Sequence, residues 1–185
     1  MLTNTSLVSV KQNHNRMASK GNAQLVKIDA GAREFSGACI VIVKTEWNAS
    51  IVDELEKGAI RILKKHGIKD IRTVIVPGAV EITFAVRTYW ETTKYKDVKP
   101  DAFITLGCVV RGDTPHFDYV CSSVNNGVMQ LNLKLPVPVI FGVLTVNDNK
   151  QAEERIGGKH GHKGEEAGLT ALKMIRLVKQ IKAER

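Results

Sequence analysis

The residue types best suited to chemistry gather in one polar stretch just past the middle of the chain. His116 lies there at the start of a predicted helix. Apolar residues at helical spacing indicate that helix: Phe117, Val120, Val124, Val128 and Leu131. The dipole at a helix start disfavours the imidazolium, so we predict a neutral ring that can exchange a proton with a bound substrate. A lone histidine often only caps or packs, but the polar neighbours Arg111, Asp113 and Thr114 favour the chemical role.

The segment before this helix is suited to binding an anion. An apolar run, 102–106, is predicted to be a buried strand, and a loop bounded by Gly107 and Gly112 leads from it to the helix. Thr114 is predicted to be the N-cap and Pro115 the first helical residue. Free backbone N–H groups and the positive end of a helix dipole would then meet at the carboxyl edge of a sheet, which favours phosphate binding.

Strands and helices alternate along the chain, which predicts an α/β fold with a doubly wound, mainly parallel sheet between two helical layers. The expected strands are 38–43, 71–76, 102–106 and 138–144. The expected helices are 51–66, 81–90, the one that begins near His116, 150–155 and 165–183. Carboxyl ends of parallel strands meet at one edge, so Trp47, Glu81 and His116 should lie together with the 107–114 loop. Trp47 could instead pack on the following helix, and Glu81 could merely support its own helix.

Composition sets limits on the class of protein. A chain of 185 residues with 43% hydrophobic and 25% charged residues is typical of one soluble domain. No apolar run approaches the roughly 20 residues of a membrane span, and no secretory signal is expected. The three cysteines are odd in number and lie in or beside apolar segments, which favours reduced thiols and a cytoplasmic location. The net charge of +8 allows attraction to phosphates, but the basic residues are dispersed and aromatics are few, which disfavours nucleic-acid binding.

The two ends of the chain differ in character. Residues 1–22 are polar and lack acidic residues, so we predict a flexible arm before a domain that spans 23–185. A transit peptide would carry more arginine, and Met17 could be the natural start. Residues 24–28 could form a short edge strand.

A glycine-rich loop, 157–164, lies before the last helix and carries Lys159 and Lys163. Its composition suits phosphate, but it lacks the spacing of a P-loop, so nucleotide binding is not favoured. His160 and His162 are too few for a metal site, and no C-x-x-C pair occurs, so no metal is expected.

Several longer motifs, taken in order, resemble one known family. They are Trp47-Asn48 after the first core strand, Pro77-Gly-Ala-Val-Glu81, LGCVVRGDTPHFDYVC at 106–121, PVIFGVLT at 138–145, and QAEERIGGKHGHKG at 151–164. From about Phe35 to Ile181 the chain is similar to the lumazine synthase family of riboflavin biosynthesis.

The resemblance implies a flavodoxin-like three-layer fold and one reaction. The family condenses 5-amino-6-(D-ribitylamino)uracil with 3,4-dihydroxy-2-butanone 4-phosphate to 6,7-dimethyl-8-ribityllumazine, and it uses no metal or organic cofactor. Imine formation, phosphate elimination and ring closure are proton transfers that proximity and one acid/base group can promote. One alternative is a non-catalytic flavin- or lumazine-binding cage on the same fold. Another is a sugar-phosphate isomerase that uses His116 and Glu81.

The resemblance also implies roles for individual residues. His116 would be the proton donor and acceptor, and Trp47, often phenylalanine in the family, would stack on the pyrimidine. The residues implied to contact the organic substrate are Trp47, Asn48, Ala79, Val80, Glu81, Cys108, Val109, Val110 and Phe141. Those implied to bind the phosphate are Gly112, Asp113, Thr114, Arg155 and Lys163. Asp113 would use its backbone N–H, because its carboxylate must point away from a phosphate.

Family membership would further imply assembly. The site would lie between adjacent subunits of a pentamer, with Phe141 supplied by the neighbour and an N-terminal strand added to the neighbour's sheet. The compact 157–164 turn resembles that of members whose pentamers close into an icosahedral shell. Riboflavin synthase is a possible partner.

Overall fold

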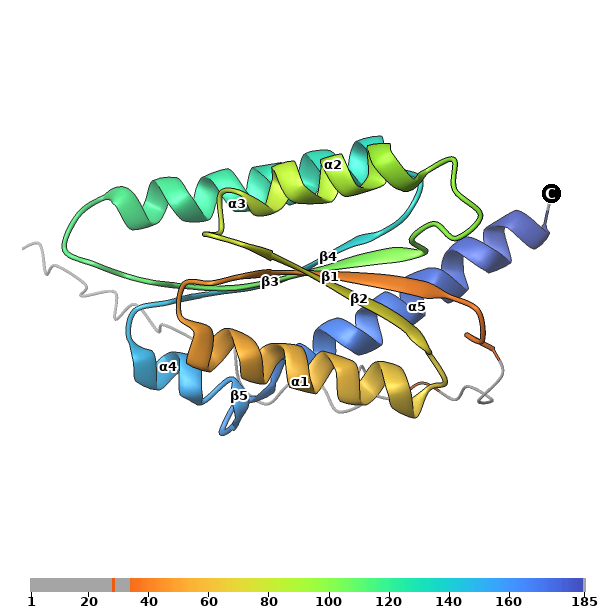
Figure 1. Cartoon of the computed structure of the whole chain (residues 1–185). Helices are drawn as coiled ribbons and strands as arrows, with labels where there is room; N and C mark the ends of the chain where they lie inside the picture. The colour runs from red at the N-terminus through yellow and green to blue at the C-terminus, as the bar shows by residue number, and fades with distance from the viewer. Residues whose placement is uncertain (1–27, 29–33, 185) are drawn as a thin grey trace, which may run out of the picture.

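The structure, a computed structural model, describes residues 28 and 34–184. The predicted arm, 1–22, lies outside the described residues, as does the predicted strand 24–28 except for Ile28, which is not in a strand. The chain forms three layers (Figure 1), so the predicted α/β sandwich is confirmed.

The middle layer is a parallel sheet in the order β2-β1-β3-β4. Its strands are β1 (Cys39–Thr45), β2 (Asp70–Val76), β3 (Ala102–Val110) and β4 (Val139–Val146). β1 and β3 occupy the centre and are largely buried on both faces, which is why their sequences are mostly apolar.

Helices cover both faces of the sheet (Figure 1). α1 (Ala49–Lys65), α4 (Asn149–Glu153) and α5 (Lys163–Ala183) lie on one face, and α2 (Ile82–Thr93) and α3 (His116–Lys134) lie on the other. Two apolar cores result. Ile40 and Ile42 of β1 face α1 and α5, whereas Val41 and Val43 face α2 and α3. Each fully buried side chain of this size contributes about 1.5–3 kcal/mol of transfer free energy.

The structure corrects two predictions at the centre of the chain. β3 does not end at Gly107 but continues to Val110, because Gly107 pairs with Val143 as an ordinary ladder residue. The connecting loop is therefore 111–115. Thr114 is not the N-cap: Pro115 occupies that position in a right-handed helical conformation, without a side-chain cap.

The glycine-rich segment after α4 is also more ordered than predicted. Two short strands, β5 (Ile156–Gly158) and β6 (Gly161–His162), form an antiparallel hairpin. Gly157 and Gly161 have φ values of 119° and 76°, and this left-handed geometry permits the tight reversal. α5 begins at Lys163, two residues earlier than predicted.

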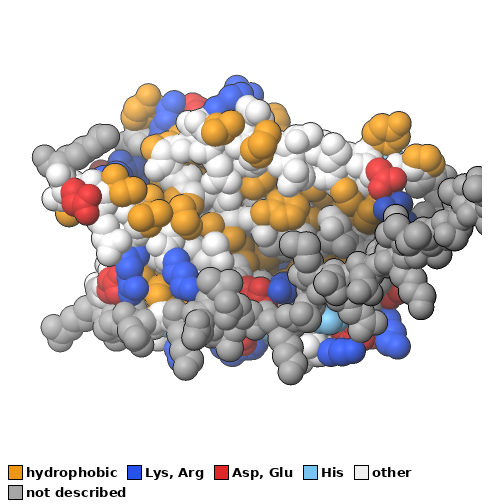
Figure 2. All heavy atoms as spheres, turned by 180° about the vertical axis from the view of Figure 1, so that it is seen from behind, with side chains coloured by type: hydrophobic (Ala, Val, Ile, Leu, Met, Phe, Trp, Pro, Cys, Tyr) orange, Lys and Arg blue, Asp and Glu red, His pale blue; other side chains and the backbone are white. Residues whose placement is uncertain are grey.

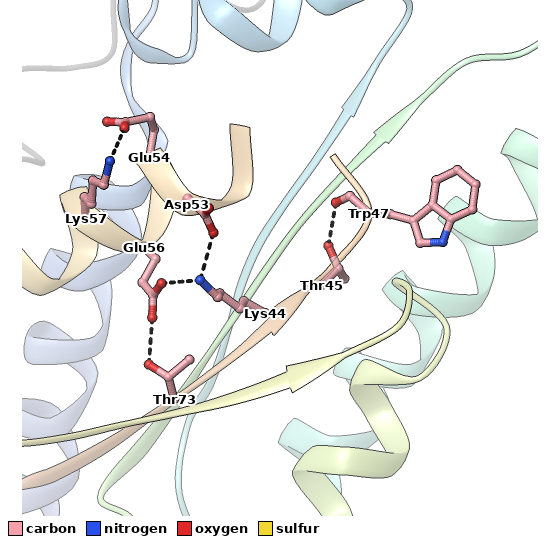
Figure 3. Close-up of polar contacts among 8 residues, drawn as sticks. All are labelled: Lys44, Thr45, Trp47, Asp53, Glu54, Glu56, Lys57 and Thr73. Atoms are coloured by element: carbon pink, nitrogen blue, oxygen red, sulfur yellow. Dashed lines mark hydrogen bonds and ion pairs between the residues drawn. The ribbon is translucent and has the colours of Figure 1, made fainter. Parts of the chain in front are cut away.

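A charged cluster joins β1, α1 and β2. The ammonium of Lys44 contacts Asp53 at 2.8 Å and also Glu56, which accepts a hydrogen bond from Thr73 (Figure 3). Burial alone would lower the pKa of Lys44, but its hydrogen bonds to the two carboxylates hold the pKa above its ordinary value. Lys44 therefore stays charged at neutral pH, and its contacts fix α1 over the sheet.

Candidate active site

Loops at the carboxyl ends of β1, β2 and β3 are tied to one another. The backbone N–H of Glu46 donates to the carbonyl of Val76 at 2.8 Å, and the side-chain amide of Asn48 donates to the carbonyl of Cys108 at 2.7 Å. The segments at the carboxyl ends of β1, β2 and β3 therefore meet at one edge of the sheet, where the sequence predicts the site.

Trp47 and Glu81 lie beside each other across Gly78. A Cβ added to Gly78 would lie 3.0 Å from a carboxylate oxygen of Glu81 and 3.9 Å from the indole of Trp47. The indole is 74% exposed and projects away from the Lys44 cluster (Figure 3). Packing of Trp47 against the following helix does not fit this exposure, so the ring is free to stack on a planar ligand.

Asn48 links the start of α1 to the end of β3. It has φ 57° and ψ 42°, the left-handed conformation, and is the one non-glycine residue with positive φ in the described part of the chain. Its amide bond to the Cys108 carbonyl joins the first turn of α1 to the end of β3. One donor of Asn48 is thus used by the protein itself.

We expect Asn48→Ala to lower the free energy of unfolding by about 2 kcal/mol, because alanine loses the bond to Cys108 and is strained at positive φ. Glycine at position 48 is not strained at positive φ but also lacks the bond to Cys108. Asn48→Gly should therefore lower the free energy of unfolding by about half as much. Urea denaturation of the two variants and of wild type measures both contributions, the backbone strain and the lost hydrogen bond. Equal stability of Asn48→Ala and wild type would contradict this role of Asn48.

The end of β3 places its side chains on two faces. Cys108 is 4% exposed and packs in the core beside α1 and α5, and Val110 packs partly against the same core. Val109 packs partly against the core on the opposite face, as Ala79 does. Burial raises the pKa of the Cys108 thiol to about 11, so the thiol stays protonated at neutral pH. Cys108 therefore belongs to the core rather than to a nucleophilic site.

The loop that leads into α3 is open to solvent. Gly112, Asp113 and Thr114 are exposed, and so is His116, the first residue of the helix. Among the described residues, the imidazole of His116 has no hydrogen-bonding partner. A ring in this position is available to a ligand held at the carboxyl edge.

A second group of predicted residues lies elsewhere. A cavity of about 440 Å³ runs along the outer edge of β4, and its lining includes Phe141, Lys163 and Glu166. Figure 2 views the molecule from behind and shows hydrophobic side chains spread over much of that face. Phe141 pairs with Thr105, five residues before Val110 in β3, which places it roughly 16 Å from the carboxyl end of that strand.

Arg155 is joined to this second group by a backbone hydrogen bond with Lys163. Its carbonyl accepts a hydrogen bond from the N–H of Lys163 at 2.8 Å, and its guanidinium donates to the carbonyl of Gln151 at 2.7 Å. The ammonium of Lys163 is paired with Glu166 at 2.7 Å. These residues lie with α4 and α5, on the opposite face of the sheet from α3 and His116 (Figure 1).

The histidines of the hairpin have separate surroundings. His160 lies 3.5 Å from Glu154, whereas the ring of His162 packs so closely on Gly58 of α1 that a Cβ there would be 2.1 Å from it. Burial lowers the pKa of His162. Within residues 28 and 34–184, no group of three or more histidine, cysteine or acidic residues could hold a metal ion. None of the described helices is both long and apolar enough to span a membrane.

Sequence reasoning missed several polar partners. Glu166 neutralises Lys163, and its i,i+3 spacing on the last helix was a usable signal. Asn132 exchanges hydrogen bonds with Val139 and so fixes α3 to the start of β4. Only the three-dimensional structure could reveal that contact.

The fold and the polar groups at its carboxyl edge define a flavodoxin-like α/β enzyme with a small-molecule site. Residues 37–179 match the 6,7-dimethyl-8-ribityllumazine synthase family. The chain therefore belongs to that family, which makes it a transferase of riboflavin biosynthesis.

Individual relatives agree with this assignment, and each carries the name 6,7-dimethyl-8-ribityllumazine synthase. The protein from Parabacteroides distasonis is 50% identical over 138 residues, which are 74% of this chain and 83% of the relative. The Bacteroides fragilis protein is 50% identical over 74% of this chain and 94% of its own length. The Porphyromonas gingivalis protein is 51% identical over 75% of this chain and 84% of its own length.

Proposed function

We propose that the carboxyl-edge residues bind 5-amino-6-(D-ribitylamino)uracil and join it to 3,4-dihydroxy-2-butanone 4-phosphate, giving 6,7-dimethyl-8-ribityllumazine. The observation that carries this proposal is the juxtaposition of an exposed indole and a carboxylate, Trp47 and Glu81, across Gly78. Trp47 stacks on the pyrimidine, and Glu81 accepts hydrogen bonds from ribityl hydroxyls. Ala79, Val80, Val109 and backbone groups near Cys108 complete the wall.

His116 moves protons in three steps of the reaction. The amine of the pyrimidine attacks the ketone to form an imine with loss of water. Loss of a proton from carbon then expels phosphate, and the ribityl-bearing nitrogen closes the ring with loss of a second water. His116 stands at a helix start, and no described residue hydrogen-bonds to its ring, which suits it to accept and return these protons.

The phosphate is held by the 112–114 turn together with Arg155 and Lys163. Backbone N–H groups of Gly112, Asp113 and Thr114 lie at the N-terminal end of α3, where a helix favours an anion. Arg155 lies in the opposite helical layer of the same chain. This arrangement favours a site shared between two copies, in which one chain supplies His116 and its neighbour supplies Phe141, Arg155 and Lys163.

Exposed apolar side chains support such an assembly. Phe84 of α2 and Leu133 of α3 are 73% and 75% exposed, and Phe141 of β4 is 41% exposed. We propose a pentamer as the basic unit, with pentamers closing into an icosahedral shell in the cytoplasm. Riboflavin synthase is the proposed partner of this assembly.

The reaction is tested by following lumazine absorbance and fluorescence with both substrates present. Product above the spontaneous rate, and dependent on each substrate, supports the proposal. Omission of either substrate is the control. Failure of well-folded, assembled protein to form product would contradict the catalytic account and favour the binding cage.

A further inference from the structure

The side chain of Arg111 joins three elements at the end of β3. Its guanidinium contacts both carboxylate oxygens of Asp118, at 2.9 and 3.4 Å, and lies 4.1 Å from the centre of the Phe117 ring. It also donates to the side chain of Asn147, beyond the end of β4, at 3.3 Å. Asp118 and Phe117 belong to the first turn of α3, so one side chain spans the entry and the exit of the 111–115 loop.

The loop between these anchors has little packing of its own. Gly112, Asp113, Thr114 and Pro115 are all exposed, and a Cβ added to Gly112 would meet nothing within 4 Å. Its shape must therefore be set where it is attached. At its entry the backbone N–H of Arg111 donates to the Val146 carbonyl at 2.9 Å, and at its exit the side chain of Arg111 reaches α3.

The charge of Arg111 is already used inside the protein. Asp118 neutralises it, and the Phe117 ring lies against it, so an incoming anion would have to compete with Asp118 for the guanidinium. Arg111 and Asp118 are 44% and 62% exposed, and an ion pair this open adds little to global stability. The effect of this ion pair is therefore local, because it holds the turn and the start of α3 in one relative position.

We propose that Arg111 is a positioning residue that sets the shape of the phosphate-binding turn by clamping β3 to the first turn of α3, without itself binding phosphate. This inference rests on the proposed role of residues 112–114. Backbone N–H groups bind an anion well only when they converge on it, and small misplacements cost large factors in reactions that depend on orientation.

The direction in which one substitution changes phosphate affinity separates positioning from direct binding. Asp118→Ala removes a negative charge near the turn and frees Arg111. If Arg111 were a phosphate ligand, this change would tighten binding of inorganic phosphate. A clamp predicts weaker binding by about tenfold, similar to Arg111→Ala, and no further loss in the double variant. Calorimetry with inorganic phosphate on the assembled protein gives the dissociation constants.

Further variants distinguish geometry from charge and from general stability. Arg111→Lys keeps the charge but not the fork, so it should bind phosphate as weakly as Arg111→Ala. The Michaelis constant for the butanone phosphate should rise with each variant, while that for the pyrimidine and the unfolding midpoint stay near wild type. Arg61→Ala breaks a comparable exposed pair, with Glu165, and should leave phosphate binding unchanged.

Two results would overturn the inference in different ways. Tighter phosphate binding by Asp118→Ala, or wild-type binding by Arg111→Ala, would refute the clamp while leaving the turn as the phosphate site. If wild-type protein binds no inorganic phosphate, the proposed phosphate turn itself is wrong, and the clamp fails with it.

Discussion

Replacement of Gly164 by alanine is expected to lower the free energy of unfolding by about 3 kcal/mol. Gly164 lies in the first turn of α5, and a Cβ there would fall 1.9 Å from the carbonyl oxygen of Leu55 in α1. The obstacle is backbone, so no rotation of a side chain can relieve the clash. The two helices must separate, which exposes the core that they share with the sheet.

Urea denaturation of Gly164→Ala beside Gly168→Ala measures this effect with a matched control. Gly168 lies one turn later on the same helix, and its added Cβ would be 3.1 Å from the Ala59 carbonyl, so a small shift can accommodate it. We expect its cost to be about 1 kcal/mol. Equal stability of Gly164→Ala and wild type would show that the close approach of α1 and α5 is wrong.

His116→Ala is expected to lower kcat by about 10²-fold or less. Acid/base groups contribute 10²–10⁴-fold, and this condensation proceeds partly without help, so the lower end of the range applies. His116 begins α3 and is exposed, so the protein should fold as before. Steady-state rates of lumazine formation at saturating substrates provide the measurement.

His66→Ala is the matched control for loss of a histidine. His66 follows α1, and its ring contacts the Ile62 carbonyl at 2.9 Å, away from the carboxyl edge. This variant should keep the wild-type kcat. If His116→Ala also keeps it, His116 is not the acid/base group, and proximity alone must account for the chemistry.

The fold was largely predictable because burial dictates the sequence of its central strands. Residues 39–43 are continuously apolar and 102–106 are apolar except for Thr105, and only a strand covered on both faces tolerates that composition. The extension of β3 through Gly107 was missed, because glycine usually marks a break and only the pairing with Val143 shows otherwise. Thr114 was misplaced for a related reason: Pro115 has helical φ and ψ and takes the cap position itself.

The candidate site was predictable where topology alone decides it. Trp47, Glu81 and His116 each follow a parallel strand, so they had to reach the same edge. Local sequence contains no signal for pairs far apart in the chain, such as the amide of Asn48 on the Cys108 carbonyl. Nor does sequence spacing reveal that Arg155 and His116 lie in opposite layers, since this depends on which face each helix covers.

The central proposal is that each site combines His116 of one chain with Arg155 of another, and mixing two inactive variants tests it most directly. His116→Ala and Arg155→Ala chains are unfolded together in equal amounts, refolded, and assayed at low butanone phosphate. Random assembly gives about a quarter of the sites both functional groups, so activity should rise well above that of either variant alone. If the mixture shows only the mean of the two separate activities, the site lies within one chain and the shared-site account is wrong.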